Sequence, residues 1–370
     1  MKKLILVAGA RPNFMKIAPL IHALKGNKNI KPVLVHTGQH YDVKMSGQFF
    51  DELNIPAPDI NLEVGSASHA VQTARIMEGF EQVCITEKPD FVMVVGDVNS
   101  TAACTMVAAK IDGIRTIHYE AGLRSGDRTM PEEINRRVTD AITDVFFTTS
   151  ADADENLLKE GVASDKIFMA GNLMIDSLTA NLQKAEGMSL IFNLLNKDKK
   201  IEPLLFKKYG VMTFHRPSNV DNEFSLKNLV KIWANVSKRV PLIFPVHPRT
   251  YKNIQKFGLQ KEIDNCENLY FIEPLGYLQF INLVKNSAFT LTDSGGIQEE
   301  TTFMNIPCLT VRPNTERPVT IWEGSNKLIK INEIESEIDL ILQGKGKKGK
   351  TPKFWDGHTA ERIVKILEKM

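Results

Sequence analysis

Acidic and basic side chains alternate between residues 118 and 136, where the chain reads HYEAGLRSGDRTMPEEINR. Glu120 ends a short predicted strand, and Glu132 lies at the beginning of a predicted helix. Carboxylates can accept and donate protons, while guanidinium groups such as that of Arg124 bind anions. We predict that this loop holds an anionic ligand and moves protons beside it.

Asp97 follows a continuous apolar strand over residues 91–95. Aspartate is a favoured residue for capping the amino end of a helix, so one interpretation is that Asp97 only caps the next helix and has no chemical role. Asn99 and Ser100 are also capping residues, and the helix does not need Asp97 for its cap. We therefore favour an acid or base function for Asp97.

Glu132 has a competing structural interpretation. Residues 129–132 read TMPE, which matches a capping box with proline in the first turn. In that case Glu132 accepts a hydrogen bond from the amide of Thr129. The alternative is that Glu132 reaches a ligand, with Glu133 on the other side of the helix.

Basic residues follow the first predicted strand. Gly9 permits a tight turn there, and Arg11 and Lys16 add positive charge near a helix N-terminus, which favours a phosphate. A glycine at this position is common in α/β domains, so the motif alone is weak evidence for a ligand.

The second half of the chain carries a sharper phosphate signal at Ser294, Gly295 and Gly296. They are predicted to begin a helix, where unpaired amides can bind a pyrophosphate. Glu300 lies one turn further and can bond ribose hydroxyls, and Arg317 is a further candidate anion contact.

His215 and Arg216 form the first strand-to-helix loop of this half. His215 can carry a proton or donate a hydrogen bond to a pyrophosphate, and Arg216 can reinforce the latter. The alternative is that the pair only anchors the loop. His247, after the next strand, is assigned a supporting role.

These residues need a scaffold, and the pattern of the chain predicts one. Short β-branched runs alternate with segments of helical period, which indicates α/β domains with parallel sheets. We predict strands in two groups, near 3–7, 32–36, 91–95, 116–118 and 145–148, and near 209–213, 242–246, 269–272, 288–291, 308–311 and 328–331.

The predicted domains are 1–170 and 171–352, with a long helical stretch over 174–197 following the boundary. Residues 344–350 read GKGKKGK and are expected to be flexible, and an amphipathic helix is predicted over 359–369. Ligands of such sheets bind outside the carboxyl ends of the strands, so we expect one site in a cleft between the two domains.

Composition narrows the class of protein. The net charge of +2 gives no case for nucleic-acid binding. No stretch approaches the about 20 apolar residues of a membrane span, and the four cysteines form no CxxC pair, so we expect a cytoplasmic protein. Asp152 and Asp154 have the DxD spacing of metal-dependent glycosyltransferases, but they begin a helix and favour its dipole, so we predict no metal site.

Three motifs resemble those of the UDP-N-acetylglucosamine 2-epimerase family, and the resemblance runs nearly end to end. They are HYEAGLR at 118–124, GDVNS at 96–100 and SGGIQEE at 294–300. The resemblance implies two Rossmann-like domains facing a cleft, the GT-B architecture. It also implies that the last segment, 353–370, packs back on the first domain.

The resemblance further implies a non-hydrolysing epimerase that interconverts UDP-GlcNAc and UDP-ManNAc for cell-envelope polysaccharides, through UDP elimination and a glycal. Asp97, Glu120 and Glu132 are then the acid and base groups, with His215 also catalytic. Gln39 and His40 line the sugar site, and the turn at Leu275 contacts uracil. We expect a homodimer with no metal or redox cofactor. Alternatives are a hydrolysing epimerase, an epimerase of 2,3-diacetamido uronic acid sugars, a GT-B glycosyltransferase and a catalytically silent sensor.

Overall fold

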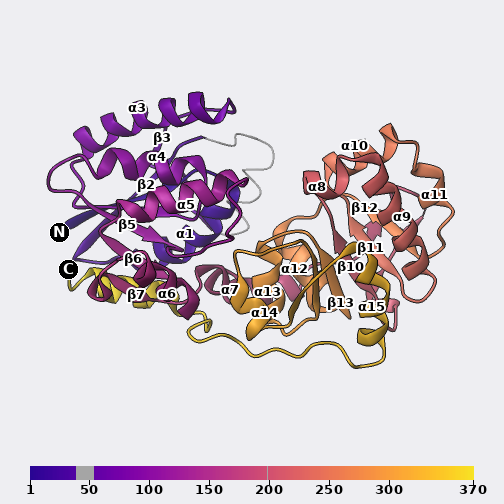
Figure 1. Cartoon of the computed structure of the whole chain (residues 1–370). Coiled ribbons are helices and arrows are strands. Elements are labelled where there is room, and N and C mark those ends of the chain that lie inside the picture. Colours follow the sequence, from indigo (N-terminus) through magenta and orange to yellow (C-terminus); the bar gives the residue numbers. More distant parts are fainter. Residues whose placement is uncertain (39–53, 198) are drawn as a thin grey trace. The chain divides into compact units, whose positions relative to one another are not determined.

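The computed structural model describes residues 1–38, 54–197 and 199–370. Its contacts divide the chain into two compact units, which are described separately (Figure 1). Unit 1 comprises Met1–Ala180 and Lys353–Met370, and unit 2 comprises Asn181–Pro352. The chain passes from unit 1 to unit 2 within helix α7 (Leu173–Glu186).

A parallel sheet forms the centre of unit 1, with seven strands among the described residues and the order β3-β2-β1-β4-β5-β6-β7. The order reverses between β1 and β4, which is where a doubly wound sheet forms its binding crevice. The strands are β1 (Lys2–Ala8), β2 (Ile30–His36), β3 (Ile60–Asn61), β4 (Phe91–Val95), β5 (Arg115–Tyr119), β6 (Val145–Thr148) and β7 (Ile167–Met169).

Helices cover this sheet, which explains why β4 is buried along its whole length. Two of them, α3 and α4, pack against Ile5 and Val7 of β1, while α1 contacts β1 and β4 and is itself contacted by α16 (Figure 1). Besides α7, the described α-helices of unit 1 are α1 (Arg11–Leu24), α3 (His69–Glu87), α4 (Asn99–Ala108), α5 (Pro131–Ala141), α6 (Ala151–Lys159) and α16 (Thr359–Leu367).

Unit 2 has a second parallel sheet, with the order β12-β11-β10-β13-β14-β15 among the described strands. Its order reverses between β10 and β13, so this sheet has a binding edge of the same kind. The strands are β10 (Gly210–Thr213), β11 (Leu242–Pro245), β12 (Leu269–Ile272), β13 (Phe289–Thr292), β14 (Cys308–Val311) and β15 (Asn326–Ile329).

An aromatic core fills one side of this sheet, where Trp233 packs against Phe214 and Phe244 at centroid distances of 5.2 and 5.4 Å. The helices around it are α8 (Pro217–Val220), α9 (Glu223–Ser237), α10 (Pro248–Lys256), α11 (Gln260–Asp264), α12 (Tyr277–Lys285), α13 (Gly296–Phe303), α14 (Pro318–Trp322) and α15 (Ile334–Leu342). The predicted α/β fold with parallel sheets is confirmed.

The predicted helix over 174–197 is wrong in its second half. Helix α7 ends at Glu186, next to Gly187, and the chain then forms a hairpin of β8 (Phe192–Asn193) and β9 (Lys200–Ile201). Leu190 and Phe192 are buried in the core of unit 2. Burial of these side chains outweighs the helical period that the sequence suggests.

The lysine-rich segment 344–350 forms no helix or strand, but it has specific contacts within unit 2. Lys347 donates hydrogen bonds to the carbonyls of Ile321 and Asn326, and the amide of Lys350 donates to Glu323. A Cβ at Gly349 would lie 2.3 Å from the backbone of Gly324. These contacts attach the segment to the rest of unit 2, and its expected flexibility stays a prediction.

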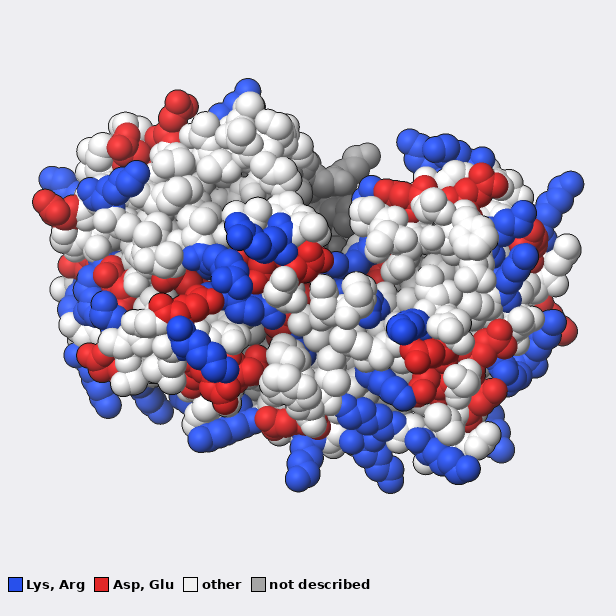
Figure 2. Space-filling model, viewed as in Figure 1, with Lys and Arg blue, Asp and Glu red and all other residues white. Residues whose placement is uncertain are grey.

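Charges of both signs lie side by side on the face of the molecule shown in Figure 2, in keeping with the net charge of +2. Among the described residues, every helix is too short or too polar to cross a membrane. Binding of an anion must therefore rest on local clusters of side chains.

Candidate functional site

The carboxyl edge of the unit 1 sheet carries a buried ion pair between Lys16 of α1 and Glu120, which follows β5. Their charged atoms, Nζ and Oε2, lie 2.7 Å apart, and the side chains are 10% and 2% exposed. The sequence predicted both residues as functional, and the structure brings them together. A charged pair so far from water requires close partners, and here each group supplies the other.

Backbone strain marks the same place. Glu120 has a φ of 69°, a left-handed conformation that is costly for a residue with a side chain. Gly96, with a φ of 72°, lies beneath the pair, since a Cβ built there would be 3.5 Å from Oε2 of Glu120 and 3.6 Å from Nζ of Lys16. Strained residues persist where the surrounding structure fixes them, which is typical of active sites.

Asp97 directly follows Gly96 and lines a pocket of about 290 Å³. Helix α4 begins at Asn99 with Val98 as its N-cap, and no side chain caps it there, so Asp97 is not the cap that the alternative required. Glu132 lines the same pocket. Two of the predicted acid and base groups thus face one space, whose other lining residues are Ser66, Ala67, His69, Gln72, Val98, Asn99, Pro131 and Asn135.

The capping-box interpretation of Glu132 is wrong. Helix α5 has Met130 as its N-cap without a side-chain cap. The amide and hydroxyl of Thr129 donate instead to Asp127, at 3.0 and 2.6 Å. Glu132 is exposed, whereas its neighbour Glu133 is fully buried, so the two glutamates have different surroundings.

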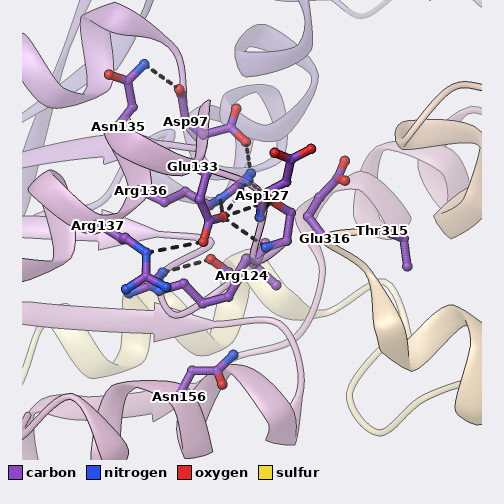
Figure 3. Close-up of polar contacts among 12 residues, drawn as sticks. Asp97, Arg124, Asp127, Glu133, Asn135, Arg136, Arg137, Asn156, Thr315 and Glu316 are labelled. Carbon is purple, nitrogen blue, oxygen red and sulfur yellow. Dashed lines mark hydrogen bonds and ion pairs between the residues drawn. The ribbon is translucent and has the colours of Figure 1, made fainter. Parts of the chain in front are cut away.

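Arg136 is a residue of this cluster that the sequence analysis did not select. Its guanidinium lies between Asp97 and Glu133, at 2.5 and 2.9 Å (Figure 3). Burial raises the pKa of Glu133, but hydrogen bonds from the Ser125 amide and from Arg136 outweigh this and lower it below its usual value. An arginine three residues after a buried glutamate is the pattern that reveals such a pair on a helix.

A second buried network supports the backbone around Glu120. His118 Nδ1 lies 2.6 Å from Asp140, and its Nε2 lies 2.8 Å from the carbonyl of Gly96. Asp140 also accepts from the Gly122 amide and pairs with Arg124 at 2.7 Å. Both neighbours of the His118 ring are hydrogen-bond acceptors, which hold the ring from its two sides. The network fixes the turns on either side of Glu120.

The turn after β1 is organised by Asn13, another residue missed from the sequence. Its Oδ1 accepts from the amides of Gly9 and Ala10 at 3.1 and 2.9 Å, and its Nδ2 donates to Val95. Arg11 begins α1, but its side chain lies outside the described part of the structure. The predicted binding residues Gln39 and His40 also lie outside the described residues.

In unit 2, Asp293 is the centre of the corresponding edge. This fully buried carboxylate accepts from the amides of His215 and Arg216 and from Asn219, at 3.0 to 3.1 Å, and it pairs with His215 Nδ1 at 3.1 Å. Burial by itself raises the pKa of Asp293, but hydrogen bonds from His215 and Asn219 have the larger, opposite effect. The pKa of Asp293 is therefore below its usual value, which favours the ionised carboxylate. Asp293 thereby orients the predicted His215–Arg216 pair.

His247 stands beside this group, with its ring centre 5.6 Å from that of His215. It is the N-cap of α10 and accepts a hydrogen bond from the Arg249 amide. Burial, reinforced by the charge of His215, lowers the pKa of His247. His247 therefore has a structural contact of its own as a helix cap, and its role in binding stays a prediction.

Gly295 and Gly296 stand at the amino end of α13, preceded by Ser294. A Cβ at Gly296 would meet nothing within 4 Å, whereas a Cβ at Gly295 would lie 2.5 Å from Glu316 Oε1. The amides of Gly295 and Gly296 are at a helix terminus with space in front of Gly296, which is the arrangement that receives an anion. The Ser294 amide donates instead to Thr292 Oγ1 at 2.9 Å.

Two buried arginines accompany this terminus. Arg312, which the sequence analysis did not select, pairs with Glu316 at 2.8 Å, and Arg317 pairs with Glu299 at 3.0 Å. Burial raises the pKa of Glu316, but Arg312 and Arg317 outweigh it and bring the pKa to about 2. The carboxylates of Glu316 and Glu299 thus balance the positive charges of the two arginines.

Glu300 lies in the first turns of α13 and is 5% exposed. Burial raises its pKa to about 8, against a hydrogen bond from Tyr277 that lowers it. Tyr277 begins α12, and Leu275, two residues earlier, packs against the core of unit 2. A buried carboxyl with a strongly shifted pKa is a candidate for binding the hydroxyl groups of a ligand.

The DxD pair lies in the first turn of α6, where Asp154 accepts a hydrogen bond from Thr148. Within residues 1–38, 54–197 and 199–370, histidine, cysteine and acidic side chains form no group of three that could hold a metal ion.

Known proteins resemble the chain over its whole length. A family model described as UDP-N-acetylglucosamine 2-epimerase matches residues 22–368. A UDP-N-acetylglucosamine 2-epimerase of Methanococcus maripaludis is 42% identical, over 99% of this chain and 98% of the relative. A UDP-2,3-diacetamido-2,3-dideoxy-D-glucuronate 2-epimerase of Pseudomonas aeruginosa is 35% identical over 100% of both chains.

The crystal structure of Methanocaldococcus jannaschii UDP-GlcNAc 2-epimerase in complex with UDP-GlcNAc and UDP matches with a TM-score of 0.86 and 39% identity, covering 100% of both chains. The resemblance stated from the motifs is confirmed, as is the expected fold. On the family model, the relatives and the matching structure, this chain belongs to the UDP-N-acetylglucosamine 2-epimerase family.

Proposed function

We propose that this isomerase interconverts UDP-GlcNAc and UDP-ManNAc without net hydrolysis. The observation that carries the proposal is the group of three carboxylates at one sheet edge, where Asp97 and Glu132 face one pocket and Glu120 lies beside Gly96. A transferase needs no such group opposite its nucleotide. An epimerase that moves the C2 proton between two faces of a sugar needs a base and an acid.

The proposed chemistry is elimination followed by addition. A carboxylate removes the C2 proton while the C1–O bond to UDP breaks, which gives a glycal with a C1–C2 double bond. A second acid then returns a proton to the opposite face of C2, and UDP re-forms the bond at C1. Atoms balance, because every group removed in the first step is restored in the second.

UDP must stay bound while the glycal exists. We assign this task to His215 and Arg216, to the Ser294 hydroxyl with the amides of Gly295 and Gly296, and to the cations Arg11, Lys16 and Arg317. Glu300 accepts the ribose hydroxyls, and the turn at Leu275 contacts uracil. Pre-oriented donors of this kind stabilise charge that develops on a leaving group.

Proton NMR of UDP-GlcNAc with the protein in deuterium oxide tests the proposal. We expect UDP-ManNAc to form, with deuterium at C2 of both epimers and no accumulation of free N-acetylmannosamine. Epimerisation without deuterium would exclude a C2 proton that exchanges with solvent. Release of UDP together with free N-acetylmannosamine would identify a hydrolysing enzyme instead.

A second substrate is favoured by one observation, the 35% identity to the Pseudomonas enzyme over the whole chain. The same NMR experiment with UDP-2,3-diacetamido-2,3-dideoxy-glucuronate decides between the two. If that sugar is epimerised and UDP-GlcNAc is not, the substrate of this protein is the uronic acid sugar and not UDP-GlcNAc.

A further inference from the structure

Helix α5 holds Asp97 at two points. Asn135 Nδ2 donates to the main-chain carbonyl of Asp97 at 2.9 Å, and Arg136 Nη1 binds its carboxylate at 2.5 Å (Figure 3). The side chain of Asp97 is 31% exposed on the pocket, whereas that of Arg136 is 2% exposed. The carboxylate therefore has one side toward the pocket and the other toward a buried cation.

Arg136 is itself fixed from behind by Glu133. Glu133 Oε2 accepts from both Nε and Nη2 of Arg136, at 3.2 and 2.9 Å, so two donors on one edge of the planar guanidinium converge on one carboxylate oxygen. The same oxygen accepts from the amide and hydroxyl of Ser125, in the loop that follows Glu120. Glu133 thus links the Glu120 loop, Arg136 and Asp97.

We propose that Arg136 is a positioning residue of the epimerase reaction, which holds the Asp97 carboxylate ionised and in one orientation toward the pocket. The inference rests on the proposed function for its catalytic meaning. In this arrangement Glu132 and Glu133 divide two tasks, since Glu132 faces the pocket while Glu133 orients the arginine. Asp97 enters the reaction as an anion and hence as a proton acceptor.

Arg137 provides a matched control. It is the next residue of the same helix, carries the same charge and pairs with the same Glu133, at 3.3 Å. It is 49% exposed, however, and its ion pairs are with Glu133 and Glu160, on the side away from Asp97. Substitution of either arginine by methionine therefore changes the net charge equally, but only the substitution of Arg136 removes the contact to Asp97.

The experiment compares Arg136→Met, Arg136→Lys and Arg137→Met with the wild-type protein, by kinetics and by thermal unfolding. We expect kcat to fall on the order of 10-fold or more in Arg136→Met with little change in KM, because misplacement of a reacting group slows the chemical step. Arg136→Lys should recover part of the loss. Arg137→Met should remain within about twofold of wild type, as for an exposed ion pair.

A second measurement does not depend on turnover. Carbon-13 NMR of aspartate labelled at the carboxyl group reports the titration of Asp97, whose signal is assigned by its loss in Asp97→Asn. We expect this titration to move to higher pH in Arg136→Met and to stay in place in Arg137→Met, because a nearby cation favours the ionised carboxyl. If Arg136→Met does not fold, Arg136→Gln, which keeps a donor for Glu133, takes its place.

The proposal is overturned if the Arg136 variant keeps the wild-type kcat, if both arginine variants lose activity equally, or if the Asp97 titration does not move. An increase in KM alone would show that Arg136 serves binding and would also reject it. Failure of the wild-type protein to epimerise any UDP-sugar would reject the proposed function, while the titration would still decide whether Arg136 controls the Asp97 carboxyl.

Discussion

Lys16 and Glu120 are 104 positions apart in the chain, yet their charged atoms lie 2.7 Å apart beneath the surface of one unit. Lys16 belongs to helix α1, and Glu120 directly follows strand β5. Parallel strands bring their carboxyl ends to the same edge, which is why these two segments meet.

The pair predicts a double-mutant cycle. Glu120→Gln and Lys16→Met should each lower the free energy of unfolding by about 3 kcal/mol, because each leaves a buried charge without its partner. The double variant should lose less than the sum. Denaturant unfolding measures the stabilities, and kcat of Glu120→Gln should fall on the order of 10²-fold or more. Strict additivity would mean that the two charges do not interact.

Glu132 and Glu133 should respond in opposite ways to the same substitution. Glu132→Gln should lower kcat on the order of 10²-fold, with the free energy of unfolding within about 0.5 kcal/mol of wild type, since the side chain is exposed and caps nothing. Glu133→Gln should cost about 3 kcal/mol of stability, because it breaks a buried ion pair. Normal turnover in Glu132→Gln would remove this residue from the acid and base set.

The helix terminus at α13 predicts a contrast between two glycines. Gly295→Val should abolish UDP binding measured by calorimetry, because its first carbon already displaces Glu316 and its branches crowd the amides that would hold a phosphate. Gly296→Ala should fold normally, since its Cβ meets nothing within 4 Å. Circular dichroism of both variants is the control for the fold. UDP affinity that survives in Gly295→Val would place the pyrophosphate elsewhere.

Glu300 predicts a stability that falls as the pH rises. Its pKa is raised from 4.5 to about 8 in the folded chain, chiefly by burial, so its contribution is complete below pH 4.5 and is lost as the pH rises through about 8. Glu300→Gln removes this loss. We expect the variant to gain about 1 kcal/mol or more over wild type at pH 8 relative to pH 5, while UDP binding weakens.

Glu316→Gln is the control with the opposite sign. The pKa of Glu316 is lowered from 4.5 to about 2 because Arg312 and Arg317 outweigh burial, so its stabilising effect is present above pH 4.5 and is lost as the pH falls toward 2. The variant should be less stable than wild type at pH 7, and the difference should narrow in acid. Parallel pH profiles for the two variants would contradict both assignments.

The sequence by itself determined the fold class and most of the strands. Apolar runs such as 91–95 and 269–272 correspond to β4 and β12 with the predicted ends. These strands can be predicted from the sequence because strands buried on both faces need apolar residues at every position. Motifs at strand ends could be recognised for a related reason, since polar residues that directly follow an apolar run are conspicuous in the sequence.

Tertiary structure alone decided which charged residues form ion pairs. Nothing in the local pattern shows that Arg136 binds Asp97, that Asp293 orients His215, or that the chain leaves its helix at Glu186 to bury Phe192. Thr129 likewise presents a capping signal that Asp127 overrides. Local sequence specifies propensities worth about 1 kcal/mol, whereas the pairing of buried charges depends on contacts between segments far apart in the chain, which exist only once the sheets have formed.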